Sequence, residues 1–314
     1  MLAPARRRPD NPRMIKWLPD VGPADRAVDV AARSLRSRLE AVRTYFRRSV
    51  KGPDEPENFH QLRVWTRRTE SALDLYADLL PRRRARKMRR TLKRIRRAAG
   101  RVRDCDVFAK RVTEAGGEWP ADLVQERKRA HKKLVAFYGR MGRDRRLRRQ
   151  VNKLLDRLRD RNSDRSERFA DRARDALRPI AAAFFAASPG EACESDALHR
   201  FRLAGKDLRY AMELLAPAFD PSFRDEVYPV LSTLQEKLGT VNDLAAAQRR
   251  LEQQIADSGD PAELSDRRRR QAAAGEDLVR VRNDFRRWWT PEMCRTLQAR
   301  FEALLGPLSS GSPA

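Results

Sequence analysis

Two histidines in this sequence each begin a row of cations spaced for one face of an α-helix. The rows are His60, Arg63, Arg67 and Arg68 and, 139 residues later, His199, Arg202, Lys206 and Arg209. Because an α-helix turns about 100° per residue, each row projects from one arc, and apolar residues occupy the opposite arc. Guanidinium, ammonium and imidazole groups in such a row can donate hydrogen bonds to successive phosphates. The pattern therefore predicts an anion-binding face on each helix.

A solvated amphipathic helix also carries cations opposite an apolar face, and one copy alone favours that interpretation. The second copy favours binding, because a solvated face need not keep the same residue types at the same offsets. Forty residues after each histidine stands a glycine, Gly100 or Gly239, and four residues further an aspartate, Asp104 or Asp243. This repetition indicates an internal duplication. As structural supports, each glycine is expected to end a helix in the left-handed conformation, and each aspartate to cap the next helix.

Helical periodicity runs through the chain from Ala24 onward, and no segment alternates like a β-strand. Helices are expected at 56–80, 196–215, 121–138, 145–161 and 261–289, with two more beginning at Pro81 and Pro221. The sequence thus predicts an all-α fold of two pseudo-symmetric antiparallel helical bundles, packed as one compact body. The predicted divisions are a flexible basic tail at 1–23, a first half at 24–161, a second half at 162–306 and a disordered tail at 307–314.

The net charge of +25, with 58 Arg and 11 Lys, favours a polyanionic partner such as nucleic acid, anionic lipid or inorganic polyphosphate. Part of the arginine excess can equally reflect codon bias. The three cysteines are far apart and fit neither a disulfide framework nor a zinc site, which favours a reducing cytoplasm. No apolar run is long enough to span a membrane, and no secretory signal is recognisable. We therefore expect a soluble cytoplasmic protein with no membrane partner.

The segment 81–97 contains 11 Arg and Lys in 17 residues. Its outward positions, opposite an apolar stripe, include Arg83, Lys87, Arg90, Arg94 and Arg97. The positions 139 residues further on do not keep this charge. Two interpretations stay open: additional anion-binding surface, for which Arg90, Arg94 and Arg97 are the candidates, or ordinary solvated charge.

Residues for catalysis or metal binding are not evident. Asp104 and Asp106 form a DxD pair, but no further His or carboxylate stands at a supporting spacing. Capping, or orienting a nearby arginine, is therefore the favoured role for them. His131 lies among basic residues and is interpreted as part of a basic surface. With no nucleophile elbow, Walker loop or paired carboxylates, we expect no enzyme activity, no metal and no cofactor.

At these motifs the chain resembles the CHAD family, the conserved-histidine α-helical domain. That family pairs a histidine with Arg or Lys at +3, +7, +8 and +10, followed by a helix ending in Leu-Gly-x-Val-Arg-Asp. The resemblance covers about residues 24–305 and implies a two-bundle helical fold whose basic surface and central pore bind inorganic polyphosphate, in some members on polyphosphate granules. The first copy departs from the motif at Glu70 and the second at Asp207. Each departure implies a lost phosphate contact or a carboxylate that holds an arginine.

The leading hypothesis is a stand-alone CHAD protein that binds inorganic polyphosphate without converting it. The ligands carried over from the family motif are the two cation rows, and Asp104, Asp243, Gly100 and Gly239 are the supports. The rival partner is nucleic acid, bound without sequence specificity because the motif helices lack exposed aromatics and base-reading Asn or Gln. A third hypothesis is a phosphohydrolase or phosphotransferase that uses the histidines, but no carboxylate cluster for Mg²⁺ accompanies them.

Overall fold

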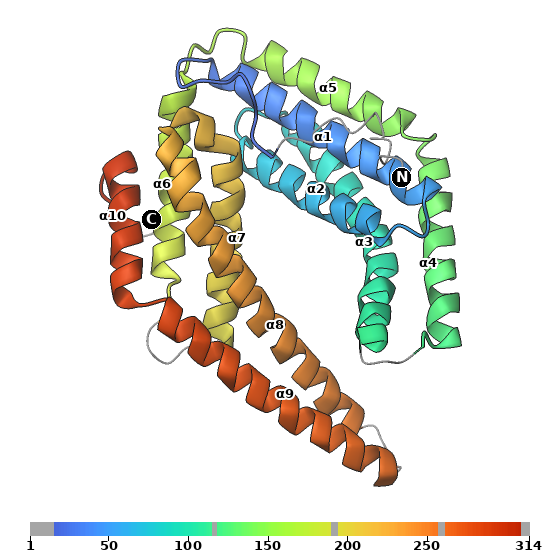
Figure 1. Ribbon diagram of the computed structural model, residues 1–314. Helices are drawn as coiled ribbons and strands as arrows, with labels where there is room; N and C mark the ends of the chain where they lie inside the picture. Colours follow the sequence, from blue (N-terminus) through green and yellow to red (C-terminus); the bar gives the residue numbers. More distant parts are fainter. Residues whose placement is uncertain (1–15, 115–117, 190–193, 257–260, 309–314) are drawn as a thin grey trace, which may run out of the picture. The chain divides into compact units, whose positions relative to one another are not determined.

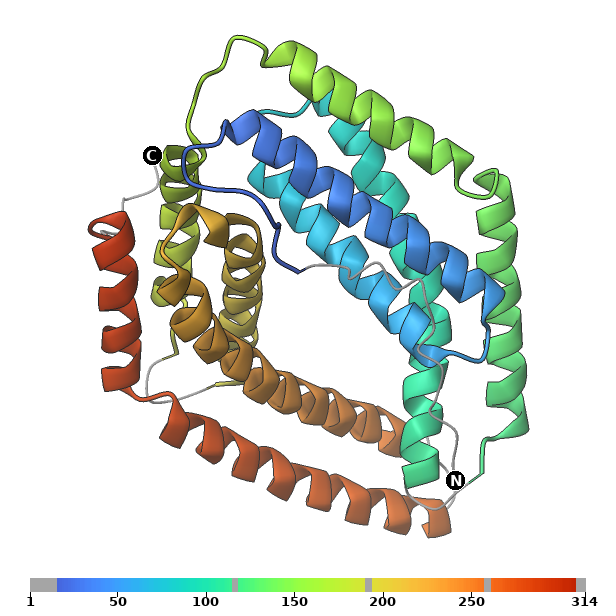
Figure 2. The same cartoon turned by 45° about the horizontal axis from the view of Figure 1, so that its top comes forward.

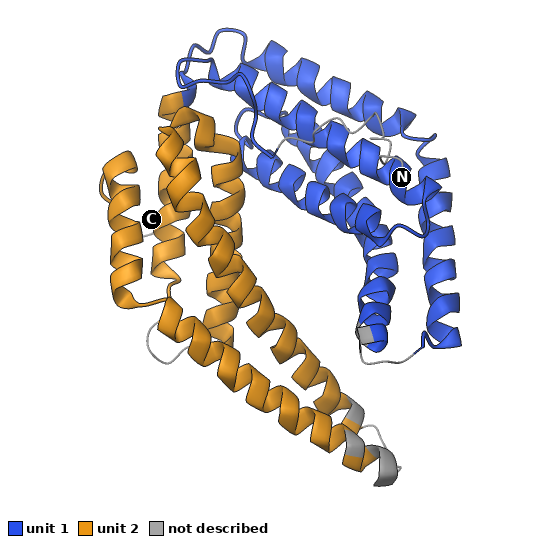
Figure 3. Ribbon diagram, viewed as in Figure 1, with its two compact units in different colours: residues 1–169 blue, residues 170–314 orange. Residues whose placement is uncertain are grey.

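The computed structural model describes residues 16–114, 118–189, 194–256 and 261–308 (Figure 1). Within these ranges the chain is helical, and its only extended pairing is an isolated bridge between Arg26 and Arg168. The all-α prediction is therefore confirmed. The chain forms two compact units, residues 1–169 and 170–314 (Figure 3). Most of the predicted N-terminal tail, and residues 309–314 of the C-terminal one, lie outside the described residues.

Unit 1 contains five helices in the described residues. They are α1 (Ala27–Lys51), α2 (Pro56–Leu75), α3 (Arg82–Glu114), α4 (Ala121–Arg140) and α5 (Arg145–Arg161). Helix α1 lies along α2, α2 packs against α3 and α3 against α4, while α5 runs beside α1 (Figures 1 and 2). Buried apolar side chains that recur every three or four residues form the core between them, among them Leu39, Phe46, Leu62, Leu92 and Ile95.

Unit 2 also contains five helices in the described residues. They are α6 (Phe169–Ala186), α7 (Ser195–Leu215), α8 (Tyr228–Ala256), α9 (Pro261–Trp288) and α10 (Pro291–Leu305). A π-helical turn, Phe223–Val227, leads into α8. Aromatic side chains dominate the core of unit 2. Phe184 stacks on Phe201 with ring centroids 4.9 Å apart, and the ring centroids of Phe201 and Trp289 are 5.2 Å apart. The helix α10 was not among the helices expected from the sequence.

The boundary between the units falls later than the sequence suggests. Residues 163–168 follow α5 but are hydrogen-bonded to the start of α1: the Ala27 amide donates to the Glu167 carbonyl at 2.9 Å, and the Phe169 amide to the Asp25 carbonyl at 2.7 Å. The Arg26 guanidinium donates to two further carbonyls of the same segment. This segment therefore belongs to unit 1, whereas the sequence placed the division at 161–162.

The predicted helix ends at Gly100 and Gly239 are wrong. Gly100 lies inside α3 and Gly239 inside α8. Neither has a positive φ; among the described glycines only Gly142 and Gly306 do. Asp104 and Asp243 consequently cap nothing, because both stand within the same continuous helices. The helices continue since the residues around each glycine are good helix formers, and one glycine costs only about 1 kcal/mol.

Candidate anion-binding clusters

Three members of the first cation row gather with a fourth cation from the neighbouring helix. His60, Arg63 and Arg67 lie on α2, and Arg103 lies on α3 one turn after Gly100. These four side chains form what we call the first cluster. All are half-buried, and the charges of the three arginines act on His60. Arg103 was not among the ligands nominated from the sequence, although it stands within the second motif.

The first cluster holds like charges together. Burial lowers the pKa of Arg63 below its usual value, Arg67 and Arg103 lower it further, and only Asp104 opposes the shift. Within the described part of the chain, Arg63, Arg67 and Arg103 form no ion pair. Repulsion between such groups disfavours their charged forms, and a bound anion would reverse this effect.

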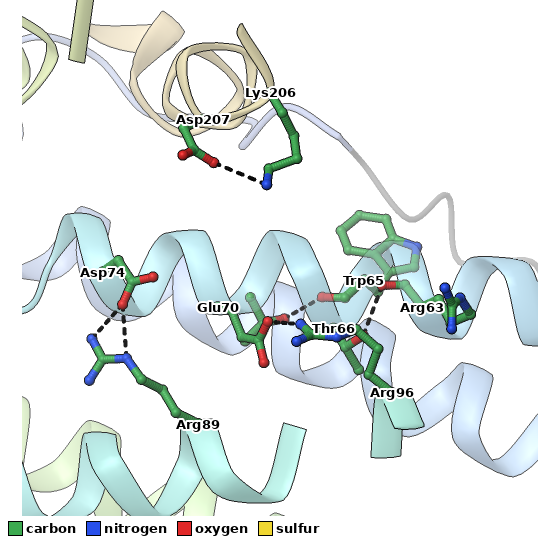
Figure 4. Close-up of polar contacts among 10 residues, drawn as sticks. Arg63, Trp65, Thr66, Glu70, Asp74, Arg89, Arg96, Lys206 and Asp207 are labelled. Carbon is green, nitrogen blue, oxygen red and sulfur yellow. Dashed lines mark hydrogen bonds and ion pairs between the residues drawn. The ribbon is translucent and has the colours of Figure 1, made fainter. Parts of the chain in front are cut away.

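Gly100, which has no side chain, lets the guanidinium of Arg63 approach α3 closely. The Cζ atom of Arg63 lies 3.5 Å from where a Cβ at position 100 would stand, and its Nη1 atom would overlap that Cβ. The guanidinium therefore lies directly against the backbone of α3. Its neighbour Thr66 donates a hydrogen bond from its hydroxyl to the Arg63 carbonyl at 2.8 Å (Figure 4). Gly100 thus permits this close approach and does not end a helix as the sequence suggested.

His60 has a pKa below its ordinary value. Burial is the largest cause, and Arg103, Arg67 and Arg63 lower the pKa further, while Glu57 opposes them. The imidazole is consequently held in its neutral form at neutral pH. A polyanion at the first cluster would favour the protonated form instead.

Glu70 and Asp207, the two carboxylates at which the sequence departs from the motif, each lie beside a cation (Figure 4). Glu70 forms an ion pair with Arg96 of α3, and Asp207 lies 3.5 Å from the Nζ atom of Lys206. Glu70 thus holds an arginine, which is one of the two interpretations that the sequence left open, whereas Asp207 lies beside a lysine of its own helix. Asp106 similarly pairs with Arg127 at 2.6 Å, so it orients an arginine as expected.

The remaining nominated cations of unit 1 lie on exposed or aromatic surfaces. Arg68 lies over the ring of Trp65, 4.8 Å from its centroid. Arg90, Arg94 and Arg97 are exposed on α3, as the outward prediction requires, and Arg94 also lies over Phe137. The guanidinium faces of Arg68 and Arg94 therefore cover aromatic rings.

In unit 2, His199 lines a pocket of about 240 Å³ formed by α7, α8 and α9, which we call the α7 pocket. The His199 Nδ1 atom lies 3.1 Å from the Asn242 Oδ1 atom. The pocket also contains two cations missed by sequence reasoning, Arg249 and Arg282. Arg282 donates to the hydroxyl of Ser195, and among the described residues its buried Nε atom has no partner. Arg249 stands seven residues after Asn242, on the same face of α8.

The other cations of the second row have distinct surroundings. Arg202 is half-buried, and its Nε atom has no partner within the described residues. Arg209 instead donates to the hydroxyl of Tyr228 at 3.0 Å and lies 3.3 Å from the carboxylate of Glu213, which is 1% exposed. Burial opposes the charge of Arg209, but Glu213 and Tyr228 raise its pKa overall. Arg209 is therefore anchored by a buried acid, unlike Arg202.

The last two supports behave differently from Gly100. A Cβ at Gly239 would meet no atom within 4 Å, so no side chain rests against this glycine. Asp243 is an exposed residue of α8. Within the described residues, no group of three or more His, Cys, Asp or Glu could hold a metal, and no helix is long and apolar enough to cross a bilayer.

The protein is thus an all-helical protein in which each unit has a histidine beside arginines. Residues 33–252 match the family model of the CHAD domain, which is more than half of the chain, and the chain belongs to this family. The structure resembles the CHAD domain of the plant Ricinus communis, with a TM-score of 0.59 at 20% identity over 90% of this chain and 94% of that one. It also resembles PptA from Streptomyces chartreusis, with a TM-score of 0.51 at 18% identity over 89% and 100%. No curated protein matches the chain.

Proposed function

We propose that this protein binds inorganic polyphosphate without converting it, through the first cluster, the α7 pocket and the α7 cations Arg202, Lys206 and Arg209. The observation that carries the proposal is the first cluster itself. Arg67 and Arg103 lie close enough to Arg63 to lower its pKa, and none of the three arginines forms an ion pair with a described carboxylate. Groups arranged in this way gain from a multivalent anion, since each phosphate relieves repulsion and accepts charge-assisted hydrogen bonds.

The chemistry of the clusters favours phosphate over a base-bearing ligand. The first cluster contains only guanidinium and imidazole groups. These groups can donate hydrogen bonds to the oxygens of every phosphate unit along a polyphosphate chain. The α7 pocket adds two guanidinium groups, the His199 imidazole, a hydroxyl and an amide, all of which can donate to oxygen atoms, against one carboxylate, Asp196. Family membership supports the same ligand, because the resemblance to CHAD proteins implies polyphosphate binding. Association with polyphosphate granules would follow from this binding and can be tested by co-localisation of a tagged protein.

The test is a titration of the full chain with long-chain polyphosphate at two salt concentrations. Binding should weaken by orders of magnitude over a few-fold rise in salt, because several phosphate contacts each release counterions. The double variant Arg63→Glu with Arg202→Glu should lose binding and keep its helix content. Loss of folding in that variant would assign the two arginines a structural role and would remove the support for the proposal.

Two further measurements separate the rival functions. Single-stranded DNA should fail to displace polyphosphate at equal phosphate concentration; displacement would favour nucleic acid as the partner. Incubation with polyphosphate and Mg²⁺ should release no orthophosphate. Release that is lost in His60→Ala would replace the binding function with a phosphohydrolase in which His60 acts as acid or base.

A further inference from the structure

Unit 1 has a second concave surface that shares no residue with the first cluster. It is a groove of about 660 Å³ between the α1–α2 connection and the outer face of α4. Its apolar part includes Trp119, Val124 and Val135, and its cationic part includes Lys128 and Lys132. Trp119 is 41% exposed and Val135 38%, so both present apolar surface in the groove. The volume lies in the range of small-molecule binding sites.

The base of this groove is held in place by polar contacts. Arg127 pairs with the buried Asp106 at 2.6 Å, and its Nη2 atom donates to the Pro53 carbonyl at 2.6 Å. The His131 Nε2 atom lies 3.0 Å from the Ser49 carbonyl, and the ring meets Phe59 edge-on. His131, expected from the sequence to be part of a basic surface, thus connects α4 to α1 and α2. These contacts fix the groove before any ligand arrives.

The two lysines on its edge are available to an anion. Lys128 and Lys132 are exposed and stand one helical turn apart on α4. Among the described residues neither forms an ion pair, whereas Arg127 beside them is already neutralised by Asp106. The groove therefore combines an open indole and two valines with two uncompensated ammonium groups. One carboxylate, Asp54, also lines it and leaves the edge with net positive charge.

We propose that this groove binds a nucleobase together with its phosphates, the base against Trp119 and the phosphates at Lys128 and Lys132. An aromatic platform beside cations is the arrangement by which proteins bind unpaired nucleotides, since every base offers a π-face. Inorganic polyphosphate has no apolar part and gains nothing from Trp119 or the valines. The groove is thus a site separate from the polyphosphate clusters. A free nucleotide and single-stranded nucleic acid share this chemistry.

The experiment compares two labelled oligomers of equal length and charge on the full chain, oligothymidylate and its abasic sugar–phosphate analogue. Because both release the same counterions, the ratio of their affinities isolates the contribution of the bases. The wild-type protein should prefer the base-bearing oligomer by roughly 5- to 150-fold for one stacked base. Trp119→Ala should bring this ratio near one, and Trp119→Phe should keep most of it. Phe108→Ala removes an aromatic of similar exposure (42%) on α3 and should leave the ratio unchanged.

Further variants test the two lysines, and a competing mononucleotide distinguishes a free nucleotide from a nucleic acid as the ligand. Lys128→Glu with Lys132→Glu should weaken both oligomers without changing their ratio. Displacement by thymidine monophosphate that depends on Trp119 would assign the groove to free nucleotides, and preference for the oligomer alone would assign it to nucleic acid. Equal wild-type affinity for the two oligomers overturns the proposal. So does a Trp119-dependent affinity for an acidic peptide with none for the base-bearing oligomer. Arg63→Glu should leave the ratio intact, so failure here and failure of polyphosphate binding are distinguishable.

Discussion

The guanidinium of Arg63 on α2 lies against Gly100 on α3, at a point where any Cβ would overlap its Nη1 atom. The equivalent glycine of unit 2, Gly239, has no atom within 4 Å of a Cβ. Both glycines stand inside helices, where alanine is favoured by about 1 kcal/mol. Gly100 is buried beneath a guanidinium, whereas Gly239 is half-buried and has no cation against it.

Gly100→Ala should weaken polyphosphate binding without unfolding the protein. The new methyl group displaces the far end of a flexible side chain, so the gain in helix propensity offsets most of the cost. The displaced Arg63 then loses its position in the first cluster, and affinity should fall several-fold. Gly239→Ala is the matched control and should raise the free energy of unfolding by roughly 0.5–1 kcal/mol with binding unchanged. Equal loss of binding in both variants would contradict this role for Gly100.

Stability should depend on pH through His60. The pKa of His60 is lowered in the folded protein, so the unfolded chain binds a proton more readily. Stability is therefore complete above the unfolded pKa of about 6.5 and decreases as the pH falls from there toward the folded value. His60→Gln should remove this part of the decrease. Denaturant unfolding of both proteins across this window is the measurement, with His131→Gln as a comparison in the same unit.

Polyphosphate binding should be linked to protonation of the same residue. The bound anion stabilises the imidazolium form, so the pKa of His60 rises on binding and a proton is taken up. Affinity should consequently increase as the pH falls through the bound pKa toward the free one. Calorimetry in two buffers of different ionisation enthalpy detects this proton uptake. If uptake persists unchanged in His60→Gln, another group is responsible.

Arg209 is expected to contribute more to stability than to binding. Its partner Glu213 is almost fully buried and also accepts a hydrogen bond from the Tyr228 hydroxyl at 2.7 Å. Arg209→Met leaves that carboxylate buried without its counter-charge, which should cost roughly 3 kcal/mol in the free energy of unfolding. The double variant Arg209→Met with Glu213→Met should recover most of this loss. A single variant that is fully stable and merely binds less polyphosphate would show Arg209 to be a ligand.

Helix periodicity was enough to predict most of this fold. The expected segments 121–138 and 145–161 agree closely with α4 and α5, because their apolar positions recur regularly. The helix ends predicted at the two glycines were wrong for a physical reason. A glycine followed by an aspartate is the local signature of a helix end, but Gly100 serves the close approach of Arg63, which is a tertiary contact that no local pattern reveals. Arg103 and Arg282 were missed likewise, because Arg103 acts on His60 from α3 and Arg282 lines the pocket of His199 from α9.

The α7 pocket gives the sharpest test of the cations that sequence reasoning missed. Each arginine that contacts a phosphate contributes about 0.7 to 0.9 to the slope of log affinity against log salt. Arg249→Gln with Arg282→Gln should therefore reduce that slope by about 1.5, along with the affinity itself. Arg280→Gln is the control, because Arg280 lies on the same helix as Arg282 but is exposed and paired with Asp277. If the single variants Arg280→Gln and Arg282→Gln change the slope of log affinity against log salt equally, net charge and not the pocket determines binding.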